Sequence, residues 1–280
     1  MNMFLTDAIA YTSQVKATWS PEAKGYKTAM TNIRHCLEII GDKLVESITA
    51  DDFTNIQRTA TKERGKANAT ANRWTMALTT VLNTLKKRGK LQGEVPYCEL
   101  LPEPKGRVTF YTEQEVEDML LACSDLDDGD VVHDCIKFAA LTGARQGEIL
   151  KLQWSDVYFE DQQLVFRDTK NKGEDRWLPI TPLLMTHLKE MQERRIDEQV
   201  FDIDKDKLLR RMRKAQEIAG VKNAKNKCFH TLRHTAATRL FANGAELPVA
   251  MEILGHSNAK TTMRYSHATQ EGMRKALAQL

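Results

Sequence analysis

A chain of 280 residues with 41% hydrophobic and 28% charged side chains is long enough for two domains and can bury substantial cores, which excludes a disordered chain. Its formal net charge of +3 argues against a uniformly basic nucleic-acid binder, but does not say where the charges lie. The apolar stretches are too short for a membrane span, and the N-terminus lacks the cationic start and apolar block of a secretory signal. The five cysteines are scattered and form no CxxC pair, which argues against a disulfide or zinc framework. We therefore expect a soluble, cytoplasmic protein.

Three helices are predicted in the first hundred residues. A serine cap followed by a first-turn proline opens a helix over residues 20–40, which ends at a glycine. A threonine with aspartates after it opens a short helix over 49–57. Apolar residues spaced by three and four make one buried face of a longer helix over 66–89, which ends in cations and a glycine. These patterns indicate a helical first domain, 1–102.

A second domain, 103–280, follows a linker at 100–107 that contains two prolines and a glycine. Thr112 and Glu115 form a capping box that starts a helix, and a further helical pattern runs over 130–141. The period then changes to that of strands at 157–159, 164–166 and 176–180. Helical patterns continue to the end of the chain. The second domain is therefore expected to be mainly α with one small antiparallel three-stranded sheet.

The charges in the second domain are strongly segregated. Residues 111–130 hold eight carboxylates and no Lys or Arg, whereas residues 205–239 hold eleven Lys or Arg against two acids. The acidic run is typical of a solvated helix face. The basic run continues into a cluster of His and Arg, which favours a surface that faces phosphates.

Two segments place a cation where a phosphate could bind. Arg145 follows a helix-ending glycine and opens the next helix, where free backbone N–H groups and a guanidinium suit a phosphate. Glu148, three residues later, would hold this turn, and the Arg145–Glu148 spacing is also typical of a surface ion pair. Lys170 and Lys172 lie at a turn just before the third predicted strand, where lysines are usually only solvated.

Two further segments contain histidines and a tyrosine. His230 and Arg233 are three residues apart, so they share one helix face and can reach one ligand. No Cys, Asp or Glu stands at ligand spacing from them, which argues against a metal site. His256 follows Gly255, and Tyr265 stands nine residues after His256. A single tyrosine near the end of a chain is usually a packing residue.

Taken together, the order Arg145, Lys170, His230-x-x-Arg233, Gly255-His256 and Tyr265 resembles the tyrosine recombinases, the family of phage integrases and of Xer-type and Cre-type recombinases. The resemblance covers the whole second domain, about 104–280. The first domain looks like the helical core-DNA-binding domain of this family, on helix pattern and position alone. The resemblance implies the tyrosine recombinase fold and an enzyme that cuts and rejoins duplex DNA through a 3′-phosphotyrosine intermediate, without metal or cofactor.

The same resemblance implies a role for each matching residue. Tyr265 would be the nucleophile, and Arg145 and Arg233 would clamp the non-bridging phosphate oxygens. His256 would donate a third hydrogen bond, and His230 would accept the tyrosine proton. Lys170 would be the general acid for the leaving 5′-hydroxyl, with Lys172 as the competing choice. His234 and His267 are interpreted as structural.

The implied partner is double-stranded DNA, held between the two domains against the basic segment 205–239 and the helix end 86–90. The last segment, 268–280, would pack on its own domain or, as in the family, dock on a neighbouring protomer and build a synaptic homotetramer. Accessory DNA-bending proteins are a further expected partner. Many phage integrases carry an additional N-terminal arm-binding domain of about sixty residues; its absence here indicates either an Xer-like two-domain layout or a shortened chain.

The expected role is integration or excision of mobile or phage DNA, at the nucleoid of a bacterial cell or phage-infected host. Three alternatives stay open: Xer-type resolution of chromosomes or plasmids, a monomeric type IB topoisomerase-like relaxase, and a DNA-binding regulator that has lost cleavage. Every residue type that cleavage needs is present, which argues against the regulator.

Overall fold

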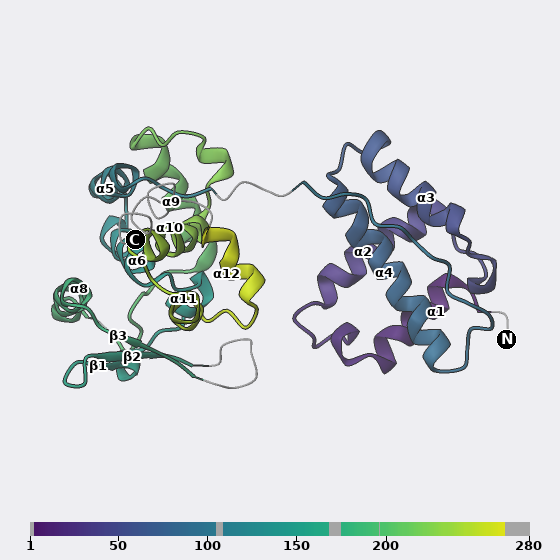
Figure 1. Ribbon diagram of the computed structural model, residues 1–280, viewed down its shortest axis with the longest axis horizontal. Helices are drawn as coiled ribbons and strands as arrows, with labels where there is room; N and C mark the ends of the chain where they lie inside the picture. The colour runs from purple at the N-terminus through teal and green to yellow at the C-terminus, as the bar shows by residue number, and fades with distance from the viewer. Residues whose placement is uncertain (1–2, 105–108, 168–174, 196, 267–280) are drawn as a thin grey trace, which may run out of the picture. The chain divides into compact units, whose positions relative to one another are not determined.

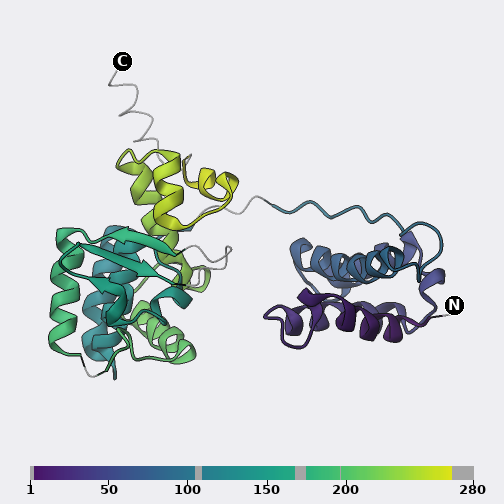
Figure 2. The ribbon, with the colours of Figure 1, turned by 90° about the horizontal axis from the view of Figure 1, so that it is seen from below.

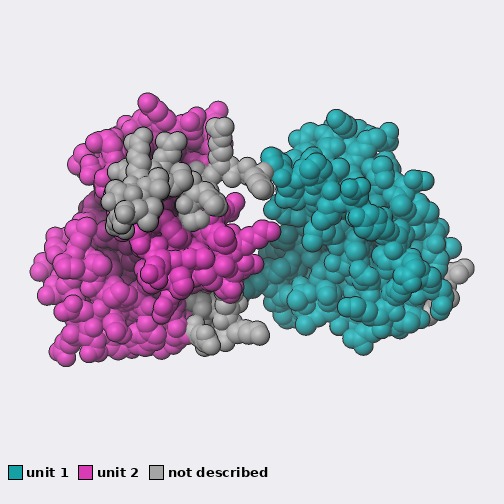
Figure 3. Space-filling model, viewed as in Figure 1, with its two compact units in different colours: residues 1–106 teal, residues 107–280 magenta. Residues whose placement is uncertain are grey.

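The computed structural model describes residues 3–104, 109–167, 175–195 and 197–266. The chain forms two compact units, residues 1–106 and 107–280 (Figure 3). The division falls inside the stretch 100–107, which the sequence marks as a linker. No helix within the described ranges is long and apolar enough to cross a membrane.

Four α-helices form the first unit in the residues that the structure describes (Figures 1 and 2). They are α1 (Leu5–Val15), α2 (Tyr26–Ile40), α3 (Ala50–Arg58) and α4 (Asn68–Lys87). Helix α4 packs against the other three, and its buried face repeats every three or four residues, as in Trp74, Leu78 and Leu85. This face supplies much of the core of the first unit.

The helix predicted over 20–40 begins later than expected, at Tyr26. Residues before it form a 3₁₀ turn (Ala17–Trp19) and further turns, and the carbonyl of Ser20 accepts the Ala23 N–H at 2.9 Å instead of starting a helix. Helix α1 was not predicted, because Phe4 at its N-cap offers no capping side chain. The start of α3 is as predicted: the Asp52 carboxylate accepts the backbone N–H of Thr49 at 2.8 Å.

The second unit is mainly α with one small sheet, as predicted (Figure 1). Its helices are α5 (Glu113–Ala122), α6 (Gly129–Thr142), α7 (Gln146–Ile149), α8 (Pro182–Glu193), α9 (Lys205–Ile218), α10 (Phe229–Ala242), α11 (Leu247–Leu254) and α12 (Ala259–Ser266). Helices α6 and α10 pack against each other at its centre. The capping box at the start of α5 is confirmed, since Thr112 N–H donates to Glu115 at 2.9 Å and Glu115 N–H donates to Thr112 Oγ1 at 3.1 Å.

The sheet is antiparallel in the order β1 (Val157–Tyr158), β2 (Gln163–Phe166) and β3 (Arg176–Pro179). Leu164 lies opposite both Val157 and Leu178, and these three side chains join the core of the second unit. The alternation along β3 turns Arg176 and Leu178 inward and leaves Trp177 half-exposed. Strand β3 therefore carries one buried cation toward the interior of the unit.

The two oppositely charged runs of the second unit lie partly against each other. Lys207 pairs with Asp128 at 2.9 Å and Arg211 with Asp127 at 3.0 Å. Lys227 pairs with Glu115 at 2.6 Å, and both of these side chains are largely buried. The acidic run is therefore more than a solvated face, and these cations of the basic run contact carboxylates.

Candidate active site

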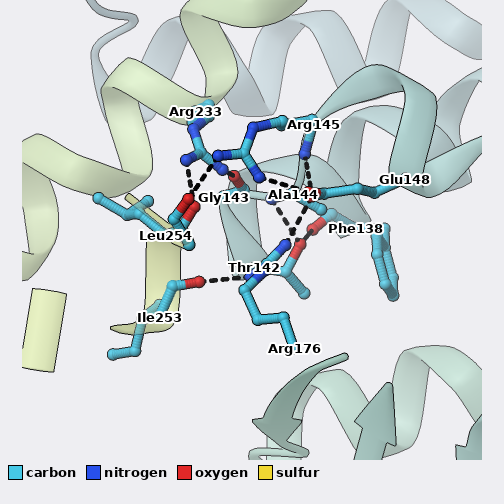
Figure 4. A network of polar contacts seen from close by, with 11 residues as sticks. Phe138, Thr142, Gly143, Ala144, Arg145, Glu148, Arg176, Arg233, Ile253 and Leu254 are labelled. Atoms are coloured by element: carbon cyan, nitrogen blue, oxygen red, sulfur yellow. Dashed lines mark hydrogen bonds and ion pairs between the residues drawn. The ribbon is translucent and has the colours of Figure 1, made fainter. Parts of the chain in front are cut away.

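Three guanidinium groups from separate elements converge on the C-terminal end of α11 (Figure 4). Arg145 stands at the N-cap of α7, Arg176 begins β3 and Arg233 lies in α10. They donate to the three consecutive carbonyls that end this helix: Arg176 to Ile253, Arg233 to Leu254 and, at 2.5 Å, Arg145 to Gly255. The last carbonyls of a helix lack intrahelical partners and form the negative end of its dipole, so they suit cations.

Glu148 lies between two of these arginines. Its Oε1 accepts from Arg145 Nη1 at 2.5 Å, while its Oε2 accepts the Arg145 backbone N–H at 2.8 Å and Arg176 Nη2 at 2.6 Å. Burial alone would raise the pKa of Glu148, but the two guanidiniums outweigh it and hold the pKa below its ordinary value. Glu148 is therefore an ionised carboxylate that holds the turn, as predicted, and also fixes Arg176.

Arg233 is the most enclosed of the three arginines. Its side chain is 2% exposed, and Nη1 donates to the Gly143 carbonyl at 2.9 Å. Burial and the nearby charge of Arg145 lower the pKa of Arg233 to about 9, so it stays protonated at neutral pH. A guanidinium held on two carbonyls still has further N–H donors, because each guanidinium carries five.

Gly255 is required at the end of α11 for two independent reasons. Its φ of +61° lies in the left-handed region, which side-chain-bearing residues seldom adopt. A Cβ there would also come within 2.8 Å of Arg176 Cδ and 3.3 Å of Arg145 Nη1. The arginine cluster can close on α11 only because this position has no side chain.

We expect Gly255→Ala to destabilise the protein by about 3 kcal/mol, since a left-handed alanine costs about 1–2 kcal/mol and forced contacts about as much again. Gly244→Ala is the matched control, because Gly244 has a φ of +84° with nothing within 4 Å of an added Cβ. It should cost about 1 kcal/mol. Urea unfolding measures both. Equal losses would show that the space beside Arg176 is not required.

The tyrosine lies beside the histidines of α10. His230 and His234 stand one turn apart, and their rings meet edge-on with centroids 4.8 Å apart. The Tyr265 hydroxyl is hydrogen-bonded to His234 Nδ1, and the tyrosine is only 2% exposed, packed with Ala237 and Leu254. Burial raises the pKa of Tyr265, although the charges of Arg264 and Arg233 oppose the rise.

Three histidines at this site are kept neutral. Burial, with the charge of neighbouring residues, lowers the pKa of His234 to about 4 and that of His256 to about 4. Desolvation and the guanidiniums of Arg233 and Arg145 also lower the pKa of His230. The His256 Nδ1 is hydrogen-bonded to Thr262 Oγ1 at 2.7 Å, which fixes the ring between α11 and α12. A neutral imidazole has one ring nitrogen that carries a proton and one that is free to accept a hydrogen bond.

The structure brings most of the predicted site residues together. Arg145, His230 and His256 lie within electrostatic range of Arg233, and Arg233 in turn lies within range of Tyr265. Lys170 and its competitor Lys172, as well as His267 and the segment 268–280, fall outside the described residues. Among those that are described, no group of three or more His, Cys, Asp or Glu side chains is arranged to hold a metal ion.

Two site residues were not predicted. The sequence marks Arg176 only as the first residue of a strand and His234 only as a structural residue, yet His234 contacts the Tyr265 hydroxyl. The signal for His234 was available, because it stands four residues after His230 and so shares its helix face. For Arg176 no local signal exists, since its partners Glu148 and Ile253 are 28 and 77 residues away along the chain.

Comparison with known proteins identifies the family of this chain. The profile described as the Phage integrase family matches residues 109–271. The integrase of Escherichia phage 186 is 25% identical over 255 residues, which cover 88% of this chain and 72% of that protein. Tyrosine recombinase XerA of Thermococcus onnurineus is 29% identical over 214 residues, covering 71% and 73%.

The fold is that of solved recombinases. A Tn1549 transposon integrase in complex with transposon right end DNA superposes with a TM-score of 0.78 at 18% identity, covering 99% of each chain. A lambda integrase dimer bound to a COC′ core site gives a TM-score of 0.75 at 18% identity, covering 95% of this chain and 77% of that one. The fold and the profile match together define a tyrosine recombinase, a site-specific enzyme that cuts and rejoins DNA. The chain belongs to the phage integrase family.

Proposed function

We propose that this recombinase acts as an integrase: it inserts or excises mobile or phage DNA, and cuts each strand with Tyr265. The observation that carries the proposal is the cluster of Arg145, Arg233 and His256 beside a tyrosine whose hydroxyl contacts a neutral histidine. The integrases of Escherichia phage 186 and Haemophilus phage HP1 are relatives at 25% and 27% identity. Their names favour this role.

In the proposed reaction the phenolic oxygen of Tyr265 forms a bond to a DNA phosphorus as the bond to the 5′-oxygen breaks. The 3′-phosphotyrosine keeps the bond energy, and attack by a 5′-hydroxyl reverses the step and rejoins a strand. Arg145 and Arg233 stabilise the charge on the non-bridging oxygens with the N–H groups that α11 leaves unused. If Thr262 donates to Nδ1 of the neutral His256 ring, Nε2 carries the proton and can donate to the same phosphate.

Two protons move in each cleavage step. The phenolic proton of Tyr265 passes to a neutral imidazole, for which we propose His230. His234 is the neighbouring neutral imidazole: its Nδ1 is hydrogen-bonded to the Tyr265 hydroxyl, and its ring contacts the ring of His230. Lys170 supplies the proton to the leaving 5′-oxygen, with Lys172 as the alternative donor. Because Tyr265 is 2% exposed in the described structure, its oxygen must become accessible before it can reach a phosphate.

A nicked suicide substrate tests this reaction. After cleavage the short fragment that carries the new 5′-hydroxyl diffuses away, so rejoining fails and the covalent protein–DNA adduct accumulates. We expect the adduct to form in EDTA, and protease digestion with mass spectrometry to locate the DNA on the peptide that contains Tyr265. Attachment to another residue would contradict the assignment of the nucleophile, and absence of any adduct would favour a regulator without cleavage activity.

We further propose that DNA phosphates lie along part of the basic run 205–239. The cations concerned are exposed and, among the described residues, form no ion pair with the acidic run 111–130. These are Lys205, Arg210, Arg213, Lys214, Lys222 and Lys225. Phosphate contacts of this kind position the protein without reading sequence. Binding that weakens steeply with salt, and less steeply when these residues are replaced by glutamine, is the expected signature.

We propose a homotetramer as the active assembly, built when the segment 268–280 of each protomer docks on a neighbour on nucleoid DNA in the cytoplasm. Xer-type resolution, which the XerA relatives favour, requires the same assembly. A type IB relaxase would act as a monomer without synapsis. Sedimentation of the DNA complex, with and without residues 268–280, separates the tetrameric recombinase from the monomeric relaxase.

A further inference from the structure

We propose that Arg176 is a positioning residue for strand cleavage: through Glu148 and the end of α11 it holds Arg145 and its neighbours in the arrangement that receives the phosphate. This inference rests on the proposed function, in which Arg145 binds the phosphate that Tyr265 attacks. Arg176 itself is 7% exposed and acts through the groups around it.

Arg176 joins three elements that are distant in sequence. From the start of β3, its Nη2 donates to Glu148 Oε2 at 2.6 Å and its Nη1 donates to the Ile253 carbonyl at the end of α11 (Figure 4). The guanidinium carbon lies 4.4 Å from the centroid of the Phe166 ring on β2. The sheet, the turn before α7 and the end of α11 are therefore tied together through one side chain.

The first path from Arg176 to the phosphate site runs through Glu148. One carboxylate accepts from both guanidiniums and from the Arg145 backbone N–H, so the direction of the Arg145 fork depends on how Glu148 is oriented. Arg176 fixes that orientation from the opposite side. Without Arg176, Glu148 Oε2 loses its side-chain partner and the carboxylate can turn, which moves Arg145.

The second path runs through α11. The three carbonyls that end this helix each accept from a different arginine, and His256 follows immediately after them. If Arg176 releases Ile253, the end of the helix is held at two points instead of three. Both the Leu254 carbonyl, which orients Arg233, and His256 are then less well fixed.

The chemistry of Arg176 indicates positioning instead of a contribution to stability alone. A buried ion pair often stabilises a protein no better than apolar residues of the same volume. Arg176 Nε also has no hydrogen-bond partner among the described residues, which adds a desolvation penalty. A planar fork that reaches a carboxylate and a carbonyl at once offers what a lysine cannot: two donors at a fixed separation.

The test uses the full chain and single-turnover cleavage of the nicked substrate, which yields a rate constant at saturating DNA and a half-saturating DNA concentration. We expect Arg176→Met to lower the rate constant about 100-fold, the typical effect of misplacing a catalytic group by about 1 Å. The half-saturating concentration should stay within about twofold, because most contacts that bind DNA are backbone contacts elsewhere. Arg176→Lys should restore about tenfold, since one donor toward Glu148 returns.

A matched control and a modified substrate separate a positioning role from general acid catalysis and from the loss of an arginine partner of any buried carboxylate, since the side chains of Asp134 and Glu148 are both 8% exposed. Arg194→Met removes another arginine–carboxylate pair of the same unit, the 3.1 Å contact with Asp134, and should leave the rate constant unchanged. A 5′-thiol leaving group needs no general acid, so it should rescue Lys170→Ala but not Arg176→Met. Rescue of Lys172→Ala instead would assign the general acid to that residue and leave the role of Arg176 intact.

Three results would overturn the proposal: a wild-type rate constant in Arg176→Met, a change confined to the half-saturating concentration, or rescue by the 5′-thiol substrate. If Arg176→Met does not fold by circular dichroism, Arg176→Lys decides the question, because wild-type kinetics in that variant would equally overturn it. Failure of the proposed function is distinguishable, since an adduct in Tyr265→Phe would refute the nucleophile whatever Arg176 does.

Discussion

We expect a Tyr265→Phe variant to form no covalent adduct on the nicked substrate while it still binds the same DNA. The variant lacks the oxygen that becomes phosphotyrosine, and no neighbouring water can replace it without releasing a hydrolysed strand. Phenylalanine fills the same buried space beside Ala237 and Leu254, so the fold should lose only the hydrogen bond to His234, about 1 kcal/mol. Denaturing gels measure the adduct, and gel shifts measure DNA binding.

Tyr111→Phe is the matched control for this loss. Tyr111 is 1% exposed in the same unit, and its hydroxyl accepts from Gln216 Nε2 at 2.7 Å, so this change removes a comparable buried hydroxyl. It should leave adduct formation intact. An adduct that persists in Tyr265→Phe would contradict the assignment, and loss in both variants would show that adduct formation is sensitive to packing in general.

The fold class was predictable because its signals are local. The Thr112–Glu115 capping box, the repeat along α4 and the change of period at β1 each involve residues within a few positions of one another. Helix α1 was missed where such a signal is lacking, at a start capped by Phe4. The serine and proline at 20–21 do not start α2, because turn formation at Ser20 competes with helix initiation.

Only those site residues that belong to the sequence motifs could be predicted. These motifs mark Arg145, Arg233 and Tyr265. They also mark Glu148 as the residue that holds the turn at Arg145, but not the other groups that orient these side chains. Arg176 could not be predicted, because its role depends on Glu148 and Ile253, which the fold alone brings to it. The pairing of the two charged runs could not be predicted for a related reason: the sequence cannot show that Lys207 and Arg211 of the basic run pair with the acidic residues before α6.

We expect Glu148→Gln to be the most destabilising isosteric change in this site, at about 3–5 kcal/mol, the usual cost of removing one partner of a buried ion pair. The Glu148 side chain is 8% exposed and pairs with two guanidiniums, Arg145 and the buried Arg176. A glutamine keeps only one acceptor oxygen. Its NH₂ group would face N–H donors of Arg145 or Arg176, which leaves buried donors unpaired.

Glu113→Gln is the matched control, because Glu113 stands 4.0 Å from Arg239 with its own side chain 83% exposed. An exposed pair contributes little, so the loss should be below about 1 kcal/mol. Urea unfolding at neutral pH measures both variants. If both variants lose the same free energy of unfolding, the buried ion pairs of Glu148 stabilise the protein no more than an exposed ion pair does.

The pH dependence of this difference identifies its origin. Burial alone would raise the pKa of Glu148, yet Arg176 and Arg145 hold it below the ordinary 4.5. A carboxyl whose pKa is lowered on folding contributes stability that is fully present above its unfolded pKa and is lost as the pH falls through its folded pKa. The gap between the wild type and Glu148→Gln should therefore be constant near neutral pH and shrink as the pH falls below 4.5. A gap that stays constant through this acidic range would show that the carboxylate charge is not what holds the three arginines against α11.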